Sequence, residues 1–268
     1  MTTLTKTFND SVVIAQRNLI KIKRVPEILV FVLISPIMFV LLFAFVFGGA
    51  IDAGPGLNYR EFLIGGIFAQ TVVFGATFTG AGIAEDMQKG IIDRFRSLPM
   101  SSSAVLWGRT VSDVVYNVLS LIIMALTGLL VGWRMREGVV DALAAFALLL
   151  LFAFAISWVM AWVGLMVPSV EVINNASFIV IMPLTFVSNA FVPLESFPTG
   201  LRTFVEWNPV SALTQAVREL FGNTSAMVPT PDVWSMQHPV LYTLIWVALI
   251  LVVFVPLSVR QYRLASSR

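Results

Sequence analysis

The sequence of 268 residues contains no cysteine and a single histidine. Their scarcity excludes disulfide bonds, thiolate chemistry and metal clusters built from Cys and His. A phosphate-binding loop of the form G-x-x-x-x-G-K-[ST] is also missing from the sequence, so we do not expect this chain to bind and hydrolyse ATP by that route. Any energy from a nucleotide must come through a partner, and no cofactor is expected in the chain itself.

Charged residues are also scarce in this chain. They make up 12% of it, against 58% hydrophobic residues and a mean hydropathy of +0.89, which is far more apolar than an ordinary soluble domain. The chain is therefore expected to be an integral membrane protein. A formal net charge of only +2 indicates no nucleic-acid partner. Residues 1–24 lack the uninterrupted apolar core of a cleavable signal peptide, so they are expected to stay in the mature protein.

Six stretches have the roughly 20 predominantly apolar residues that a helix needs to cross a bilayer. They are residues 28–49, 62–83, 110–132, 142–167, 174–193 and 240–258. The sequence therefore predicts an all-α membrane protein with six transmembrane helices in one domain, residues 1–268. Because the number of spans is even, both ends of the chain should lie on the same side of the membrane.

The basic residues assign that side to the cytoplasm. With both ends inside, 12 of the 17 Lys and Arg residues lie inside: Lys6, Arg17, Lys21, Lys23, Arg24, Lys89, Arg94, Arg96, Arg109, Arg260, Arg263 and Arg268. The remaining five lie outside: Arg60, Arg134, Arg136, Arg202 and Arg218. This bias follows the positive-inside rule. We therefore expect cytoplasmic termini, with residues 259–268 as a cytoplasmic tail.

Residues 1–26 form a predicted amphipathic helix. Its apolar residues recur at steps of four and three, at Phe8, Val12, Ala15, Leu19 and Ile22. Basic residues stand among its polar positions. The pattern is typical of an interfacial helix that lies along the membrane surface with its basic side chains at the lipid headgroups.

The most informative segment is a charged helix predicted over residues 85–98, between the second and third spans. At about 100° per residue, one apolar stripe contains Met87, Ile91, Phe95 and Leu98. The opposite face gathers the charged residues Glu85, Asp86, Lys89, Asp93 and Arg96, with Arg94 at the edge of the stripe. Such a helix favours docking to a soluble partner, and the alternative is a cytoplasmic loop that folds at the headgroups. Gly90 should cost ~1 kcal/mol of helix stability relative to alanine, which favours a bend or a close backbone contact there.

Ionisable residues are missing from the central parts of the six spans, which argues against a proton-coupled carrier. Asp113, near the start of the third span, follows Arg109 by four residues. The same polar face continues through Tyr116, Asn117 and Ser120. Asp113 is interpreted first as a locally satisfied acid at the cytoplasmic boundary and second as part of a polar lining at the inner end of a substrate path. Small residues on the second span predict close packing within the chain, or else a subunit interface: Gly65, Ala69, Ala76, Gly80 and Ala84.

Residues 194–239 are too apolar for a solvated linker, and prolines divide them. Short helices that dip into the outer leaflet are therefore expected here. The candidate outer gate consists of Phe191, Pro193, Phe197, Pro198, Trp207, Asn208 and Pro209. Four charged residues are expected on the headgroup or water side: Arg202, Glu206, Arg218 and Glu219. The alternative is a surface loop that a few aromatic side chains anchor.

The order of several short motifs resembles that of ABC-2 type transporter permeases, and in particular the daunorubicin-resistance (DrrB-like) branch. The segment from Gly90 to Pro99, followed by residues 104–109, resembles the family's cytoplasmic coupling region. The outer part resembles its re-entrant region through residues 189–193, 197–198, 208–210 and Arg218. Further matches are Arg24-Val25-Pro26, Ser35-Pro36 and Phe47-Gly48. The resemblance extends over nearly the whole chain.

The resemblance implies a transport subunit, without catalytic residues of its own, in a multi-pass bacterial plasma-membrane exporter. Two such permeases, identical or different, would join two cytoplasmic ATPase subunits that supply ATP and Mg, and would export hydrophobic or amphipathic molecules. The coupling residues would be Glu85, Asp86, Lys89, Gly90, Asp93, Arg94, Phe95, Arg96, Leu98 and Pro99. Gly90-Ile91-Ile92 stands where broader family members often have Gly-Thr-Glu, which favours the drug-resistance branch.

Three alternatives remain at this point. The same general fold also serves the export of glycolipids and polysaccharides. A self-contained secondary carrier or channel is disfavoured by the lack of central ionisable residues and of a polar filter. A membrane enzyme has no acid, base or metal constellation in the sequence to support it.

Overall fold

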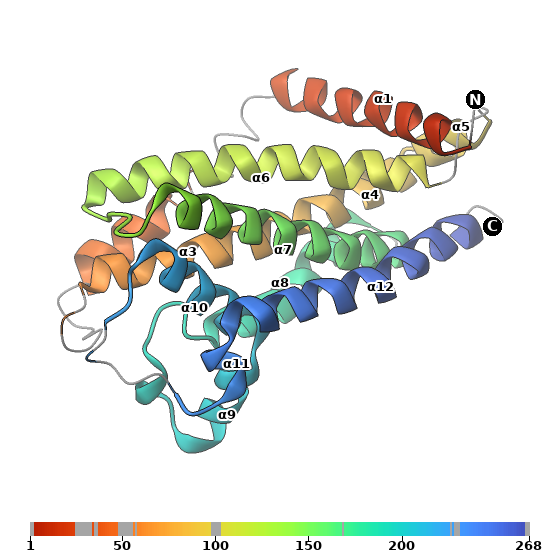
Figure 1. The fold of residues 1–268 in the computed structure, drawn as a ribbon. Helices are drawn as coiled ribbons and strands as arrows, with labels where there is room; N and C mark the ends of the chain where they lie inside the picture. The colour runs from red at the N-terminus through yellow and green to blue at the C-terminus, as the bar shows by residue number, and fades with distance from the viewer. Residues whose placement is uncertain are drawn as a thin grey trace.

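The computed structural model describes residues 3–24, 34, 37–47, 56, 58–97, 103–167, 169–225, 227 and 231–265. Within these residues the regular structure is helical, and strands are absent. The long helices run side by side along a common direction, with shorter helices gathered at one end (Figure 1). The described residues thus form the all-α fold that the sequence predicts.

Four helical segments are long and apolar enough to cross a membrane. They are Tyr59–Gln88, Ala104–Val131, Val139–Met166 and Pro239–Leu264. The first combines α3 (Tyr59–Gly75) with α4 (Thr77–Gln88), and the others are α6 (Ala104–Val131), α7 (Val139–Met166) and most of α12 (Pro239–Ala265). They coincide with the predicted second, third, fourth and sixth spans.

The predicted first and fifth spans coincide with shorter apolar helices, Ile37–Val46 and α8 (Val170–Phe186). The first ends in a π-helical turn, η1 (Leu42–Phe47), and residues 28–33, 35–36 and 48–49 of this predicted span lie outside the described residues. Helix α8 stops at Phe186 instead of residue 193, and Asn208 Nδ2 donates to the carbonyl oxygens of Leu184 and Val187 at its end, both at 2.8 Å. The arrangement of six spans stays a prediction.

Small residues bring the second span close to its neighbours, as the sequence predicts. A Cβ atom added to Gly80 would lie 2.8 Å from the carbonyl oxygen of Met160 on α7, which is closer than real Cβ contacts. The other members of the stripe are buried as well: Gly65, Ala69, Ala76 and Ala84. Packing within the chain therefore accounts for this stripe.

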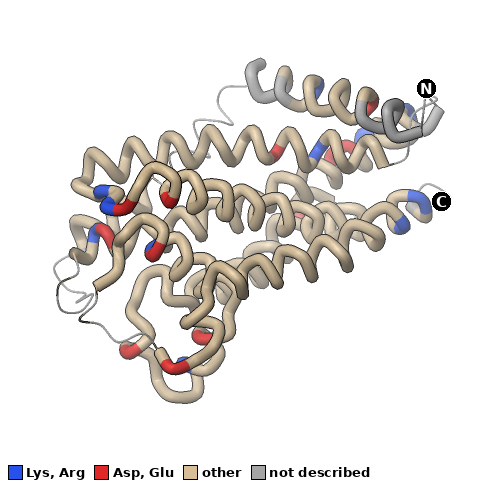
Figure 2. The backbone as a smooth tube through the Cα atoms, viewed as in Figure 1, with Lys and Arg blue, Asp and Glu red and all other residues tan. Residues whose placement is uncertain are grey.

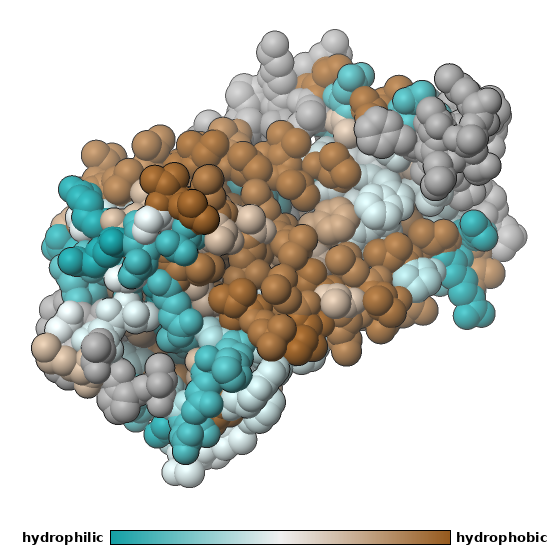
Figure 3. Space-filling model, in the orientation of Figure 1, coloured by the Kyte–Doolittle hydropathy of each residue, from teal (hydrophilic) through white to brown (hydrophobic). Residues whose placement is uncertain are grey.

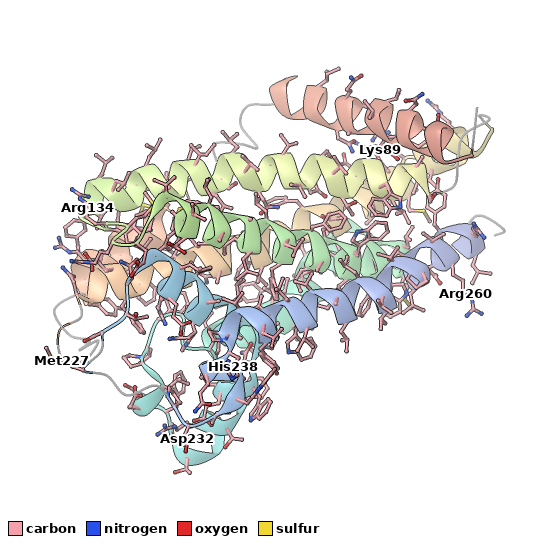
Figure 4. All side chains as sticks on the ribbon, viewed as in Figure 1. Lys89, Arg134, Met227, Asp232, His238 and Arg260 are labelled. Atoms are coloured by element: carbon pink, nitrogen blue, oxygen red, sulfur yellow. The ribbon has the colours of Figure 1, made fainter. Side chains whose placement is uncertain are left out.

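Charged side chains gather at the two ends of the helix bundle, and the middle of the bundle is almost free of them (Figure 2). A broad apolar band covers the same middle region (Figure 3). Lys89 and Arg260 lie at one end, whereas Arg134 and Asp232 lie at the opposite end (Figure 4). Helix α5 (Ile91–Ser97) and both chain ends lie at the Lys89 end. An apolar belt between two charged ends is what a bilayer-spanning bundle requires.

Helix α1 (Thr3–Arg24) lies along α6 (Figure 1), and two members of the predicted apolar stripe, Val12 and Ala15, have described side chains. Ile14, Ala15 and Asn18 are buried, whereas Val12 of the predicted apolar stripe is exposed. Gly108 on α6 allows the close approach of Ile14, because a Cβ atom added to this glycine would lie 2.6 Å from Ile14 Cβ. The prediction of a helix is confirmed, but it packs on protein as well as presenting an exposed face.

The region from 194 to 239 contains the short helices that the sequence predicts. They are η2 (Leu194–Ser196), α9 (Thr199–Trp207), α10 (Pro209–Phe221) and α11 (Trp234–Gln237). Most of α10 is buried, and it packs against α3, α7 and α12. This part of the outer region is therefore a component of the core and not a surface loop.

Candidate functional site

The charged segment after the second span consists of two helices, not the single helix predicted over 85–98. Helix α4 ends at Gln88, and α5 begins at Ile91. Gly90 lies between them with φ +63°, a left-handed conformation that glycine adopts without the steric cost of a Cβ atom. The bend expected from this glycine is therefore a complete break in the helix.

The break changes which residues of the segment are buried. Ile92, and not Ile91, is buried, together with partly buried Met87 and Phe95 in a cluster that includes Trp158 and Tyr262. A continuous helix would have placed Ile91 on the apolar stripe, but the turn at Gly90 rotates α5 relative to α4. The cluster joins the segment to α7 and α12.

Asp86 faces the interior and not a partner surface, which corrects its predicted place. Arg17 Nη2 on α1 donates to both carboxylate oxygens of Asp86, at 3.0 Å to Oδ1 and 2.7 Å to Oδ2. The side chain of Asp86 is 12% exposed and that of Arg17 34% exposed. The Arg17 guanidinium carbon also lies 5.1 Å from the centre of the Phe95 ring. Arg17 therefore connects α1 with α4 and α5, on both sides of the break.

Lys89, just before the break, and Arg94, just after it, are the exposed charged residues of this segment whose side chains the structure describes. Lys89 forms an ion pair with Glu85, four residues earlier. The hydrogen bond that Lys89 donates to Glu85 raises the pKa of the Lys89 ammonium group, so Lys89 is a cation at neutral pH. These side chains, together with Gly90, form the described edge of the coupling segment. Four members of the predicted set lie outside the described residues or have undescribed side chains: Asp93, Arg96, Leu98 and Pro99.

Asp113 is satisfied by neighbouring side chains. Thr79 on α4 donates a hydrogen bond to Asp113 Oδ2, and Arg109 Nε lies 3.5 Å from the same oxygen. Arg109 also donates to the carbonyl oxygen of Phe78 at 2.7 Å. The geometry agrees with the first interpretation of this acid, a locally satisfied group that ties α6 to α4.

The rest of the predicted polar face on α6 is also buried. Asn117 donates to the carbonyl oxygen of Asp113 at 2.8 Å, and its amide oxygen would lie 2.7 Å from a Cβ atom added to Gly75. Ser120 donates to the carbonyl oxygen of Tyr116 at 3.1 Å. The two hydrogen bonds are made within α6, and the close approach of Asn117 to Gly75 is the contact with α3. A role in a substrate path stays a prediction.

Arg218 on α10 is 2% exposed, which corrects its predicted place at the headgroups. Its Nε donates to the carbonyl oxygen of Phe62 at 2.8 Å, and its Nη2 donates to those of Asn189 at 2.9 Å and Ala190 at 3.0 Å. The guanidinium carbon lies 3.4 Å from the centre of the Phe62 ring. Burial lowers the pKa of Arg218 to about 9, so the guanidinium is still a cation at neutral pH. The carbonyl oxygens of Asn189 and Ala190 lie in the turn after α8, outside a helix, so the guanidinium supplies them with donors in a place that is buried from water.

Two glycines of α3 make room for this arrangement. A Cβ atom added to Gly65 would lie 2.8 Å from Arg218 Cγ, and one added to Gly66 would lie 2.0 Å from the carbonyl oxygen of Ala190. The pair Gly65-Gly66 is the sequence signal that could have indicated a close approach here. It does not indicate which residue approaches.

Two further contacts, which the sequence analysis missed, fix the loop between α6 and α7. Arg136 forms a two-point ion pair with buried Glu61 at the start of α3, at 2.8 and 2.9 Å. The Trp133 indole donates to Asn223 Oδ1 at 2.6 Å, and Asn223 Nδ2 donates to the carbonyl oxygen of Arg134 at 2.9 Å. Together with Arg218, these contacts join α3, α10 and the loop into one unit.

The predicted outer-gate residues occupy two environments. Phe191 is buried between Phe43 and Phe186, with ring centres 4.7 and 5.0 Å away. Asn208 accepts a hydrogen bond from the backbone N–H of Val210, and Pro209 occupies the first turn of α10. Pro193 precedes η2, and Pro198 precedes α9. Phe197, between them, packs against the apolar cluster that contains Leu194 and Val205. Trp207, in contrast, is exposed.

Comparison with known proteins supports the resemblance seen in the sequence. The ABC-2 type transporter family matches residues 10–221. The daunorubicin resistance ABC transporter permease protein DrrB1 of Streptomyces coeruleorubidus is 34% identical over 92% of this chain and 83% of its own length. The probable doxorubicin resistance permease DrrC of Mycobacterium tuberculosis is 24% identical over 88% of this chain and 81% of its own. The putative transport permease ycf38 of Cyanophora paradoxa is 24% identical over 80% and 74%.

These matches span the apolar helices, the broken charged segment at one end of the bundle and the buried α10 at the other. Each of these relatives is named a permease, which agrees with a transport subunit that lacks a phosphate loop. The chain belongs to the ABC-2 type transporter family.

Proposed function

We propose that this chain is the membrane subunit of an ATP-driven exporter that moves hydrophobic or amphipathic molecules out of the cytoplasm or the inner leaflet. The observation that carries the proposal is the build of the second span. Its 30 residues run without a long interruption from Tyr59 to Gln88 and lead directly into the break at Gly90 and the short helix α5. A push on α5 would therefore act on a helix that crosses the membrane.

Membership of the family suggests that the membrane subunits and the ATPase subunits are separate chains. Since the sequence lacks a phosphate loop, two cytoplasmic ATPase subunits would hold ATP and Mg, and a second permease, identical or different, would complete the transporter. The drug-resistance names of two relatives support an amphipathic drug as cargo. Export of glycolipid or polysaccharide is the alternative within the same family.

In this proposal the coupling residues have two roles. Glu85, Lys89, Gly90 and Arg94 form the exposed edge that meets the ATPase. The remaining members of that edge are expected from the sequence: Asp93, Arg96, Leu98 and Pro99. Asp86 and Phe95 instead position the segment through Arg17. At the other end, the candidate outer gate would close the exit path.

Reversing two charges on the exposed edge should uncouple the transporter. The variant Lys89→Glu with Arg96→Glu is expected to insert normally and to lose drug-stimulated ATPase activity, because it reverses charge at a docking surface without altering a span. The measurement uses the permease co-expressed with the ATPase of a neighbouring reading frame, purified as a complex. The matched control is Arg260→Glu with Arg263→Glu, which reverses two charges of α12 at the same end of the bundle. Equal, normal coupling in both variants would count against this docking surface.

The proposed topology predicts which sites a membrane-impermeant thiol reagent reaches in intact cells. Because the chain has no native cysteine, single cysteines report without competition. A cysteine at Asp232 is expected to react from outside, whereas a cysteine at Lys89 should react only after the membrane is opened. Both residues are exposed and lie at opposite ends of the bundle (Figure 4). Labelling of Lys89→Cys in sealed cells would overturn cytoplasmic termini.

A further inference from the structure

A small cavity lies between α1, α4, α5 and α6, beside the ion pair of Arg17 and Asp86. About 10 Å³ of it is open to the centre of a water molecule, which is room for a single water. Three side chains in its wall are polar and the others are aliphatic; they include Asn18, Asp86 and Arg109, and Ile83, Ile92 and Leu106. The three polar side chains determine what the cavity can hold.

Asn18 on α1 is 5% exposed, and only one end of its amide group is satisfied. Its Nδ2 donates to Ser112 Oγ on α6 at 3.2 Å. The Ser112 hydroxyl itself donates to the carbonyl oxygen of Arg109 at 2.7 Å, so the amide nitrogen and not the amide oxygen must face it. Asn18 Oδ1 is thus left without a donor among the residues that the structure describes. A buried acceptor without a donor is unfavourable, and a bound ligand can supply the donor.

The other two polar side chains offer a further acceptor and a donor. Both carboxylate oxygens of Asp86 accept from Arg17 Nη2, and a carboxylate oxygen can accept a second hydrogen bond. Arg109 Nε has no hydrogen-bond partner in the described part of the chain. It lies 3.5 Å from Asp113 Oδ2, which is long for a hydrogen bond. The wall of the cavity therefore offers two acceptors and one donor.

We propose that this cavity binds one water molecule, which donates to Asn18 Oδ1 and to the Asp86 carboxylate and accepts from Arg109 Nε. Buried waters typically make about three hydrogen bonds to polar groups of this kind. A cation is the other ligand that two oxygens could take, but the guanidinium groups of Arg17 and Arg109 repel it. The water joins α1 to α4 and α6. This site goes beyond the proposed export function, because it depends neither on the cargo nor on the ATPase.

Hydroxyl-radical footprinting of the full-length permease in nanodiscs tests for this water, because X-ray radiolysis of a bound water oxidises the side chains around it. Leu106 in the cavity wall is compared with Leu149 in the core of α7, since both leucines are 0% exposed. The variant Asn18→Leu removes the acceptor at nearly constant volume. Thr110→Val is the matched control, because it replaces a buried polar side chain of α6 that does not line the cavity and whose hydroxyl donates to carbonyls of its own helix.

We expect Leu106 to be oxidised several-fold faster than Leu149 in the unaltered protein and in Thr110→Val, and at the rate of Leu149 in Asn18→Leu. Equal rates for the two leucines in the unaltered protein would show a dry cavity and would overturn the site, whether or not the variants fold. Fast oxidation of Leu106 that persists in Asn18→Leu would show that bulk water reaches it and would overturn a bound water. Oxidation that falls when sodium chloride replaces choline chloride would overturn it in favour of a cation.

Discussion

Replacing Arg218 with alanine is expected to destabilise the protein by about 2–5 kcal/mol, because it removes a buried cation and the hydrogen bonds that this cation donates to backbone carbonyl oxygens. Three carbonyl oxygens, those of Phe62, Asn189 and Ala190, lose their donors together. The substitution also leaves a cavity beside Gly65, against which the side chain packs. Asn189 and Ala190 lie in the turn after α8, so their buried carbonyl oxygens have no helical donor to replace the one that they lose.

Thermal unfolding of the purified permease in detergent, followed by size-exclusion chromatography with fluorescence detection, measures this effect. Arg218→Lys should recover only part of the stability, because one ammonium group cannot match the planar fork of the guanidinium. Arg134→Ala is the control, since Arg134 is an exposed arginine at the same end of the bundle. An unfolding temperature for Arg218→Ala equal to that of Arg134→Ala would show that the three hydrogen bonds contribute nothing.

Reversing either charge of the Arg17–Asp86 pair should release α1 from the coupling segment. Arg17→Asp or Asp86→Arg alone places like charges at a mostly buried contact of 2.7 Å, at an expected cost of about 1–3 kcal/mol. The double exchange, Arg17→Asp with Asp86→Arg, restores opposite charges and should recover part of the loss. Recovery in the double variant separates a pairwise interaction from two independent defects.

Hydrogen exchange of the α1 backbone amides reports this contact directly, and drug-stimulated ATPase activity of the assembled transporter reports its consequence. Faster exchange in the single variants and slower exchange in the double variant are expected. Lys89→Ala is the control for the exchange measurement alone, because Lys89 is exposed and its ion pair is with Glu85, four residues earlier; such exposed pairs contribute little. If the exchange of α1 is unchanged in both single variants, Arg17 does not hold the helix.

Much of the fold follows from local patterns in the sequence. Long apolar runs identify the four long spans, because a bilayer demands that length of apolar helix. Pro198 and Pro209 mark the starts of α9 and α10, because the missing N–H of proline costs nothing at the start of a helix, where that group would have no helical partner. The position of Gly90 also indicates a bend, although not a complete break.

What the sequence leaves open are contacts between residues far apart along the chain. The apolar stripe of the charged segment placed Asp86 opposite the membrane, but its partner Arg17 is 69 residues earlier and on another helix. Arg218 looked like a headgroup residue because an isolated arginine on a short helix gives no sign of its partners. Those partners are backbone carbonyls, which every residue carries and which no sequence pattern distinguishes.

The hydrogen bonds of Arg218 have a consequence for the order in which the chain can fold during synthesis. Arg218 Nε donates to the carbonyl oxygen of Phe62, 156 residues earlier, so the Tyr59 end of α3 is synthesised long before the side chain that binds it. Until α10 emerges from the ribosome, the space beside Gly65 lacks the Arg218 side chain that packs against it. A nascent chain that stops before α10 would thus leave this end of α3 without the arginine that binds it.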